Sequence, residues 1–223
     1  YTTELGSAIT YDMIKDMACV VMTVPFASFG TAVTQYLYSQ DELAALQAYA
    51  ANGGNLIICS KSDRGNPAAT TEHADVITNG ILDAIGATSR IAAGIAVDNE
   101  RKENEAYRLY FTEQGNYNYE SPFLKDVLET TNNSFSCYNG APVILGAGAA
   151  SLINGYSTTW GANYTANFTG SSYVPVYETD TVVVPKGEVT VLASETLNGG
   201  GWLLLSGVTF FSTFEVKVEV ENA

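Results

Sequence analysis

The alternation of apolar and polar positions predicts strands and helices that follow one another through the first two-thirds of the chain. Residues 18–24, "ACVVMTV", are nearly all apolar, which is typical of a strand covered on both faces. Residues 39–55 predict a helix, because Ser39 and Glu42 have the spacing of a capping box and apolar residues recur on one face. The segment 55–60, "NLIICS", predicts a second buried strand, so the three segments indicate a right-handed parallel crossover.

The rest of the chain contains further apolar segments, some with the spacing of a helix and some with that of a strand. Helical spacing predicts helices over 71–89 and 121–129. Strands are predicted over 90–99, 105–113, 141–149, 188–197 and 199–211. The predicted fold is therefore α/β, with an open, mostly parallel sheet flanked by helices and a β-rich C-terminal third. We expect one domain over residues 1–213 with a loop excursion at 151–180, followed by an edge strand or linker at 214–223.

Charge and composition exclude several classes of partner. The 223 residues carry 10 basic and 24 acidic side chains, a net charge of −14 that would repel a nucleic-acid backbone. The sequence has no apolar run of about 18 residues, so membrane insertion is not expected. The three cysteines show no metal or redox spacing. We expect a domain of a longer protein, and the excess of acidic residues fits a protein that stays dispersed outside a cell.

No cofactor or metal site is predicted. The acidic run at 98–105 contains basic residues, which is typical of a solvated loop, and it lacks the spacing of a calcium-binding loop. The glycine run at 146–150 is not followed by a phosphate-binding motif.

Two segments carry a family resemblance. "ELAALQAYAANGGNLIICSKSD" (42–63) resembles the helix, strand and nucleophile turn of class I glutamine amidotransferase-like domains, and "GGGWLLLSGVTFFSTFE" (199–215) resembles their last core strand. The style of both segments is closer to non-catalytic relatives found as modules of large bacterial surface proteins. This resemblance implies a flavodoxin-like fold and an extracellular or cell-surface location in a bacterium.

The resemblance also locates the candidate catalytic positions. It places the nucleophile at Ser60, one residue after Cys59, and the catalytic histidine at Phe211, which cannot transfer a proton. The single histidine, His73, lies elsewhere in the sequence. The sequence leaves enzymatic activity undecided, favours its absence, and assigns no catalytic residue.

We therefore expect a non-catalytic accessory or binding module that contacts neighbouring domains of the same polypeptide, a saccharide or a protein ligand. Open α/β sheets bind ligands at the carboxyl ends of their strands. The candidate ligand-facing residues at that edge are Ser60, Lys61, Ser62, Asp63 and Glu215.

Two alternatives remain open. One is a cysteine or serine hydrolase that uses Cys59 or Ser60, with His73 as a candidate base. The other is a carbohydrate-binding module that uses the aromatic segment 156–177, including Trp160 and Tyr164, because aromatic faces stack on sugar rings.

Overall fold

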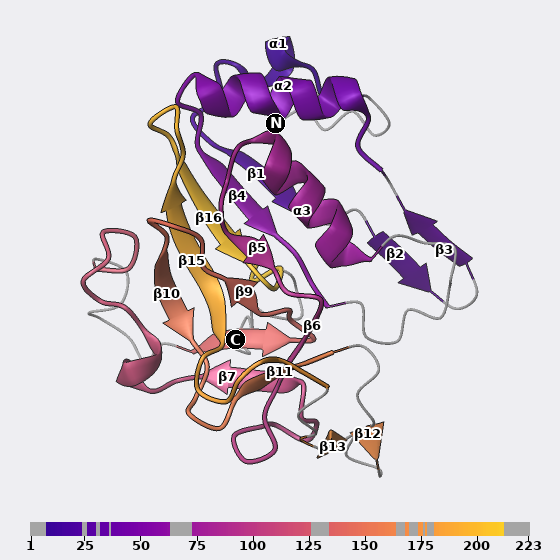
Figure 1. Ribbon diagram of the computed structural model, residues 1–223, viewed down its shortest axis with the longest axis vertical. Coiled ribbons are helices and arrows are strands. Elements are labelled where there is room, and N and C mark those ends of the chain that lie inside the picture. Colours follow the sequence, from indigo (N-terminus) through magenta and orange to yellow (C-terminus); the bar gives the residue numbers. More distant parts are fainter. Residues whose placement is uncertain are drawn as a thin grey trace, which may run out of the picture.

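The protein is rich in β-structure. The computed structural model describes residues 8–23, 26–29, 32–35, 37–62, 73–125, 134–163, 168–169, 174–175, 177 and 181–211. Figure 1 shows the helices gathered at one end of the molecule and several short strands at the other, with a large sheet running between them.

The central sheet is mixed and has seven strands. In spatial order they are β1 (Val20–Thr23), β4 (Leu56–Cys59), β16 (Trp202–Ser206), β15 (Thr190–Thr196), β9 (Val143–Ile144) and β5 (Arg90–Ile91), with β10 (Ala150–Asn154) also paired to β15. Only the β1–β4 and β4–β16 pairs are parallel, and the other pairs are antiparallel. The predicted parallel pairing of the strands on either side of the 39–55 helix is confirmed.

Three α-helices occur in the described residues: α1 (Tyr11–Ile14), α2 (Gln40–Ala51) and α3 (Ala74–Ala84). The capping box at the start of α2 is confirmed, since the Ser39 side chain accepts from the Glu42 N–H and the Glu42 carboxylate accepts from the Ser39 N–H. None of the described helices combines the length and the apolar character that crossing a bilayer would require.

The helices cover one face of the central sheet, and strands cover the other. Leu203 and Leu205 of β16 pack in a cluster with α2 and α3 residues, including Leu46 and Leu82. Leu204 points the other way and packs against a second cluster built from β7, β8, β10 and β15. The two-residue repeat of a strand produces this division, because successive side chains point to opposite faces.

Short strands complete the fold in small sheets (Figure 1). One contains β14 (Val182–Val184), β11 (Trp160–Asn163) and β6 (Gly94–Val97); the others pair β7 (Arg108–Phe111) with β8 (Phe135–Tyr138), β2 (Phe26–Phe29) with β3 (Ala32–Gln35), and β12 (Phe168–Thr169) with β13 (Val174–Pro175). A short 3-10 helix, η1 (Gln114–Asn116), follows β7.

The predicted flavodoxin-like class is therefore wrong. The expected sheet was open, mostly parallel and flanked by helices, whereas the observed sheets are mixed and most strand pairs are antiparallel. The physical reason is that an apolar run predicts a strand buried on both faces, but it does not specify whether helices or other strands cover each face. Here the β7–β8 sheet covers the face that helices cover in a doubly wound fold.

Two local predictions also differ from the structure. Residues 150–163, expected largely within a loop excursion, contain β10 and β11, which pair with β15 and β6. The later β12–β13 pair is a small hairpin. Residues 121–125, expected to begin a helix, form turns instead, and 126–129 and 214–223 lie outside the described residues.

Candidate functional site

The edge that the sequence analysis singled out lies where β4 and β16 end side by side. Ser206 of β16 is the register partner of Cys59 in β4. The Ser60 N–H donates to the Ser206 carbonyl at 2.8 Å. The segments that begin at Ser60 and Gly207 therefore leave the sheet at the same edge, as expected for parallel neighbours.

Cys59 is enclosed at this edge. Its side chain is fully buried and forms no disulfide. Burial raises the pKa of the Cys59 thiol to about 12, although a hydrogen bond with the Phe210 backbone acts in the opposite direction. The thiol is therefore neutral at physiological pH, and a neutral thiol is a poor nucleophile.

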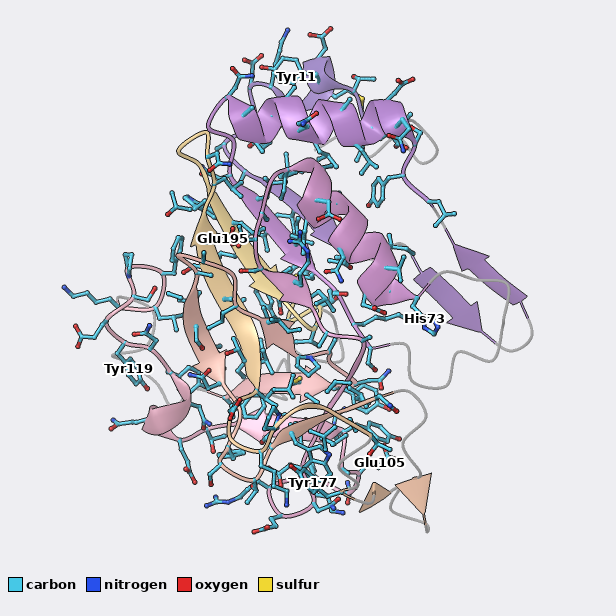
Figure 2. The ribbon with its side chains drawn as sticks, in the orientation of Figure 1. Tyr11, His73, Glu105, Tyr119, Tyr177 and Glu195 are labelled. Carbon is cyan, nitrogen blue, oxygen red and sulfur yellow. The ribbon has the colours of Figure 1, made fainter. Side chains whose placement is uncertain are left out.

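Ser60 is buried as well, and its hydroxyl contacts a threonine rather than an imidazole. Ser60 Oγ lies 2.9 Å from Thr78 Oγ1, and the Thr78 hydroxyl donates to the Ala74 carbonyl at 2.8 Å. Because the Thr78 proton is committed to Ala74, Ser60 is the donor in the serine–threonine pair. His73 lies exposed at the first position before α3, where Figure 2 labels it. The structure does not pair Ser60 with His73.

The remaining candidates at this edge are placed differently from one another. Ser62 is buried, and its hydroxyl donates to the Asn139 side chain at 2.9 Å. Lys61 is half-buried, and Phe211 is 46% exposed beside Phe210. Asp63 and Glu215 lie outside the described residues. Ser60 and Ser62 are thus enclosed rather than ligand-facing, because neighbouring elements cover this end of the sheet.

The aromatic segment does not present Trp160 to solvent. Trp160 is 1% exposed and meets Tyr177 edge to face, with ring centroids 5.4 Å apart. The Lys186 ammonium lies 5.1 Å from the Trp160 ring and 4.8 Å from the Tyr177 ring. The chain's own lysine therefore occupies the cation-binding face of this pair. Tyr164 lies outside the described residues.

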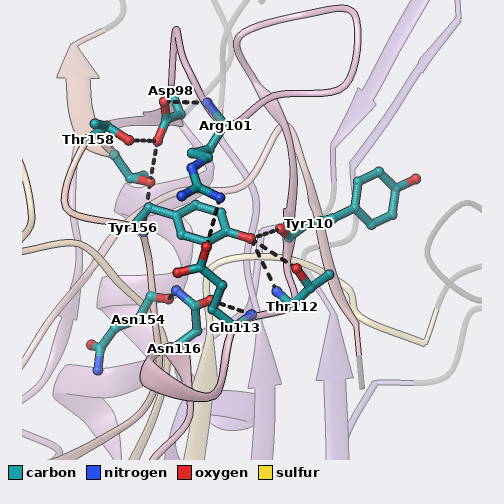
Figure 3. Close-up of polar contacts among 10 residues, drawn as sticks. Asp98, Arg101, Tyr110, Thr112, Glu113, Asn116, Asn154, Tyr156 and Thr158 are labelled. Carbon is teal, nitrogen blue, oxygen red and sulfur yellow. Dashed lines mark hydrogen bonds and ion pairs between the residues drawn. The ribbon is translucent and has the colours of Figure 1, made fainter. Parts of the chain in front are cut away.

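A buried carboxylate organises the neighbouring loops (Figure 3). One oxygen of Asp98 accepts from the N–H groups of Glu100 and Arg101 at 2.8 and 2.9 Å. The other accepts from the hydroxyls of Thr158 and Thr159 at 2.7 and 2.8 Å. Asp98 thus joins the loop after β6 to the turn before β11, and both its oxygens are used in that structural role.

Beside this network lies a small cleft with balanced charge. The Arg101 guanidinium pairs with Glu113 at 2.7 Å and lies 5.2 Å from the Tyr156 ring (Figure 3). The cleft measures about 310 Å³ and is lined by Glu100, Arg101, Lys102, Glu103, Tyr110, Thr112 and Tyr156. Two cations and two carboxylates line it, so it has no strong preference for either sign of charge.

A larger cleft opens at the other end of β16, away from the predicted edge. It measures about 550 Å³. The residues that line it are Asn118, Glu120, Ser121, Pro122, Phe123, Gly148, Ala150, Ser194, Glu195, Thr196, Gly200, Gly201 and Trp202. This size lies within the range of small-molecule and side-chain pockets in proteins.

The sheet fixes the position of Trp202 in this cleft. Trp202 begins β16, is the register partner of Thr196, and donates its backbone N–H to the Asn55 side chain at 3.1 Å. The preceding glycine is required, because a Cβ on Gly201 would lie 2.2 Å from the Gly54 carbonyl oxygen. The half-buried Trp202 ring meets the half-buried Phe123 ring edge to face at 5.4 Å. The cleft thus has a rigid aromatic floor.

Glu195 also lines this cleft, but its side chain points to the opposite face of the sheet from Trp202, because Glu195 pairs with Leu203 and Thr196 pairs with Trp202. Its carboxylate accepts from the N–H groups of Thr88 and Ser89 at 2.6 and 2.9 Å and from the Thr88 hydroxyl at 2.9 Å. Burial acts to raise the pKa of Glu195, but the hydrogen bonds from Ser89 and Thr88 outweigh burial and lower it. Glu195 therefore stays ionised at neutral pH.

Sequence reasoning missed this cleft, although one signal for it was present. A tryptophan follows three glycines at the start of a strong strand, and Ser194 and Thr196 place polar groups on the strand before it. Pairing of those two strands would have put Thr196 beside Trp202. The contribution of residues 118–123 could not have been found, because it depends on a long-range contact with no local pattern.

The comparisons with known proteins support a fold and not an activity. No family model and no curated protein matches the chain. Among solved structures, the chain is similar to one described as "mmIFT52 N-terminal domain", with 14% sequence identity, a TM-score of 0.58, and coverage of 91% of this chain and 70% of that chain. At this identity the likeness shows the fold alone. The predicted membership of the glutamine amidotransferase-like family is corrected by this neighbour and by the mixed, β-rich sheets.

Proposed function

We propose that the chain is a non-catalytic binding module whose contact site is the cleft lined by Trp202 and Phe123. One observation carries this proposal. Cys59, Ser60 and Ser62 at the carboxyl edge are enclosed, whereas an aromatic cleft of about 550 Å³ is open at the opposite end of β16. A concave site with aromatic lining and a few polar groups is the usual form of a ligand site.

The state of Cys59 and Ser60 supports a binding role over the hydrolase alternative. A nucleophile needs exposure and a base within hydrogen-bond reach. The pKa of the Cys59 thiol is raised, and the Ser60 hydroxyl donates a hydrogen bond to the Thr78 hydroxyl. The expectation that the module works beside other domains of a secreted bacterial protein stays a prediction.

Thiol chemistry tests the hydrolase alternative directly. We expect iodoacetamide to label the half-buried Cys19 of the native protein, while Cys59 and Cys137 react only after unfolding. A thiol with a pKa near 12 is ionised about 1000-fold less at pH 8 than one with the ordinary value of 9.0. Cys19 is the internal control for reagent quality. Rapid labelling of native Cys59, or a covalent adduct of Ser60 with a fluorophosphonate, would contradict the proposal.

A variant that fills the cleft tests the site itself. Thr196 is exposed, lies in a strand and lines the cleft, so Thr196→Tyr should fold and occupy part of the space. We expect compounds that raise the melting temperature of the native protein to lose that effect in T196Y. The matched control is Glu188→Gln at the other end of β15. Ligands that stabilise T196Y and the native protein equally would place the site elsewhere.

A further inference from the structure

The aromatic groups of this protein differ in whether a cation lies over them. Arg101 lies over Tyr156, and Lys186 lies over both Trp160 and Tyr177. Arg108 lies over the Tyr110 and Tyr138 rings at 5.4 and 4.9 Å. The chain has only ten basic residues, and several of them serve these contacts.

Other ring pairs in the described part of the chain, such as Tyr117–Tyr119 and Phe135–Phe210, have no such cation, and among them the Trp202–Phe123 pair lines the larger cleft. Across the described ranges, no lysine or arginine lies over either ring. Both rings are half-buried, so each keeps part of its surface open to the cleft. This pair therefore has the property that attracts a cation elsewhere in the molecule, without a cation from the described chain.

The charges around the cleft favour the same class of ligand. Glu120 and Glu195 line it, and its described lining includes no lysine, arginine or histidine. The Glu195 carboxylate is bound by Thr88 and Ser89 on the opposite face of the sheet. Glu120 is exposed, has no ion-pair partner in the described part of the chain, and supplies the negative charge of this cleft. The net charge of −14 adds a field that raises the local concentration of cations.

The wall that carries Glu120 and Phe123 is held in place before a ligand binds. Asn118 donates its backbone N–H to the Leu152 carbonyl and its side-chain amide to the Ser151 carbonyl, both at 2.9 Å. The Leu124 N–H closes a turn onto the Ser121 carbonyl at 3.0 Å. Binding would therefore require little ordering of the protein, which favours affinity.

We infer that this cleft binds an organic cation, an ammonium or guanidinium group placed against the Trp202 and Phe123 rings and paired with Glu120. The inference rests on the proposed function and specifies the ligand of that same site. The cation can belong to a small molecule or to the side chain of a basic peptide, since the recognition chemistry is shared. A phosphate or carboxylate ligand is disfavoured, because the cleft is lined by Glu120 and its described lining contains no cationic side chain.

The two tryptophans make a direct test possible. N-acetylarginine amide and tetramethylammonium are titrated into the protein while the two indole N–H signals are followed by NMR. We expect a saturable shift of the Trp202 signal, and a fixed signal from the buried Trp160 as internal reference. N-acetylcitrulline amide has the shape of the arginine probe without the charge and should cause no shift. A response to the arginine probe alone assigns a peptide source, and a response to both assigns any organic cation.

Charge variants separate a local contact from the general field. Glu120→Gln should weaken binding of the arginine probe about fivefold to tenfold at low salt, and added salt should reduce the difference. Glu188→Gln removes the same charge from an exposed position before β15 and should leave affinity nearly unchanged. Trp202→Ala should abolish saturable binding, and a far-ultraviolet spectrum verifies that this variant folds. Equal weakening by E120Q and E188Q would overturn the inference.

The outcomes distinguish this inference from the proposed function. Equal binding of the citrulline and arginine probes, or absence of a Trp202 shift at millimolar concentrations, overturns the cation site. Neither result supports the hydrolase alternative, so the proposal of a binding module would stand with another class of ligand. Labelling of native Cys59 or Ser60 would instead overturn the proposed function while leaving cation binding at Trp202 measurable.

Discussion

The two ends of β16 differ in how the chain covers them. At the carboxyl end, Ser206 and Gly207 lie beside Cys59, Ser60 and Ala141, and the side chains there are buried. At the amino end, Trp202 follows a glycine turn and lines an open cleft. Both ends belong to one strand with one hydrophobic pattern, so the difference arises from the segments packed around them and not from the strand itself.

This difference matters because open α/β sheets place their sites at the carboxyl ends of parallel strands. In this protein β16 pairs in parallel with β4 on one side but antiparallel with β15 on the other. Its amino end therefore lies beside the carboxyl end of β15, and the cleft forms there between Thr196 and Trp202. The mixed sheet thus moves the open site to the opposite edge.

The largest predicted effect comes from Gly207→Ala, which would disrupt the packing at the carboxyl end of β16, here called the closed end because its side chains are buried. A Cβ at this position would lie 1.7 Å from the Ala141 carbonyl oxygen, and the Ala141 N–H holds that residue to the Gly207 carbonyl at 2.8 Å. We expect the free energy of unfolding to fall by about 3 kcal/mol, measured by urea denaturation. Gly115→Ala is the control, since a Cβ there meets nothing within 4 Å. Equal stability of the two variants would show that the closed end is not tightly packed.

A smaller loss of stability is expected for Glu195→Gln, near the amino end of β16, here called the open end because the cleft lies there. The variant loses charge-assisted hydrogen bonds from Thr88 and Ser89, so stability at pH 7 should fall by about 2 kcal/mol. The pKa of Glu195 is lowered from its ordinary value of 4.5 in the folded protein. Its contribution is therefore present above pH 4.5 and is lost as pH falls through the lower folded value.

The pH dependence gives this variant its own control. The difference in unfolding free energy between the native protein and E195Q should shrink steadily below pH 4.5. Glu188→Gln, at an exposed position, should show a much smaller difference at every pH. A difference that stays constant down to acid pH would mean that the Glu195 carboxylate is not preferentially ionised in the folded state.

Ser60→Ala removes one hydroxyl at the carboxyl end of β4 without filling space. Loss of the hydrogen bond to Thr78 should cost about 1 kcal/mol. The double variant with Thr78→Val measures the interaction directly, and we expect a coupling energy of about 1 kcal/mol in a double-mutant cycle. A coupling energy near zero would show that the two hydroxyls do not interact, which would leave Ser60 available for other chemistry.

Sequence reasoning identified local elements better than their assembly. It found the capping box of α2, the strands on either side of that helix and the two strands β15 and β16, because propensity, capping and turn residues are local. It failed on the sheet class, since apolar runs do not specify pairing direction. It placed the site at Ser60 and Ser62 because the resemblance and the strand-end rule agreed, yet burial by α3 and Asn139 encloses both.

The smallest predicted effect concerns α3, the helix whose Thr78 holds Ser60 at the closed end. Gly80 lies inside this helix, and a Cβ there would meet nothing within 4 Å outside the helix itself. Gly80→Ala should raise the free energy of unfolding by about 0.5–1 kcal/mol, because alanine loses less backbone entropy on folding. The Trp202 cleft at the other end of β16 should keep its ligand affinity. Stabilisation accompanied by weaker ligand binding would show that the two ends of β16 are coupled through the sheet. We expect unchanged binding, because different segments pack around each end and determine its structure.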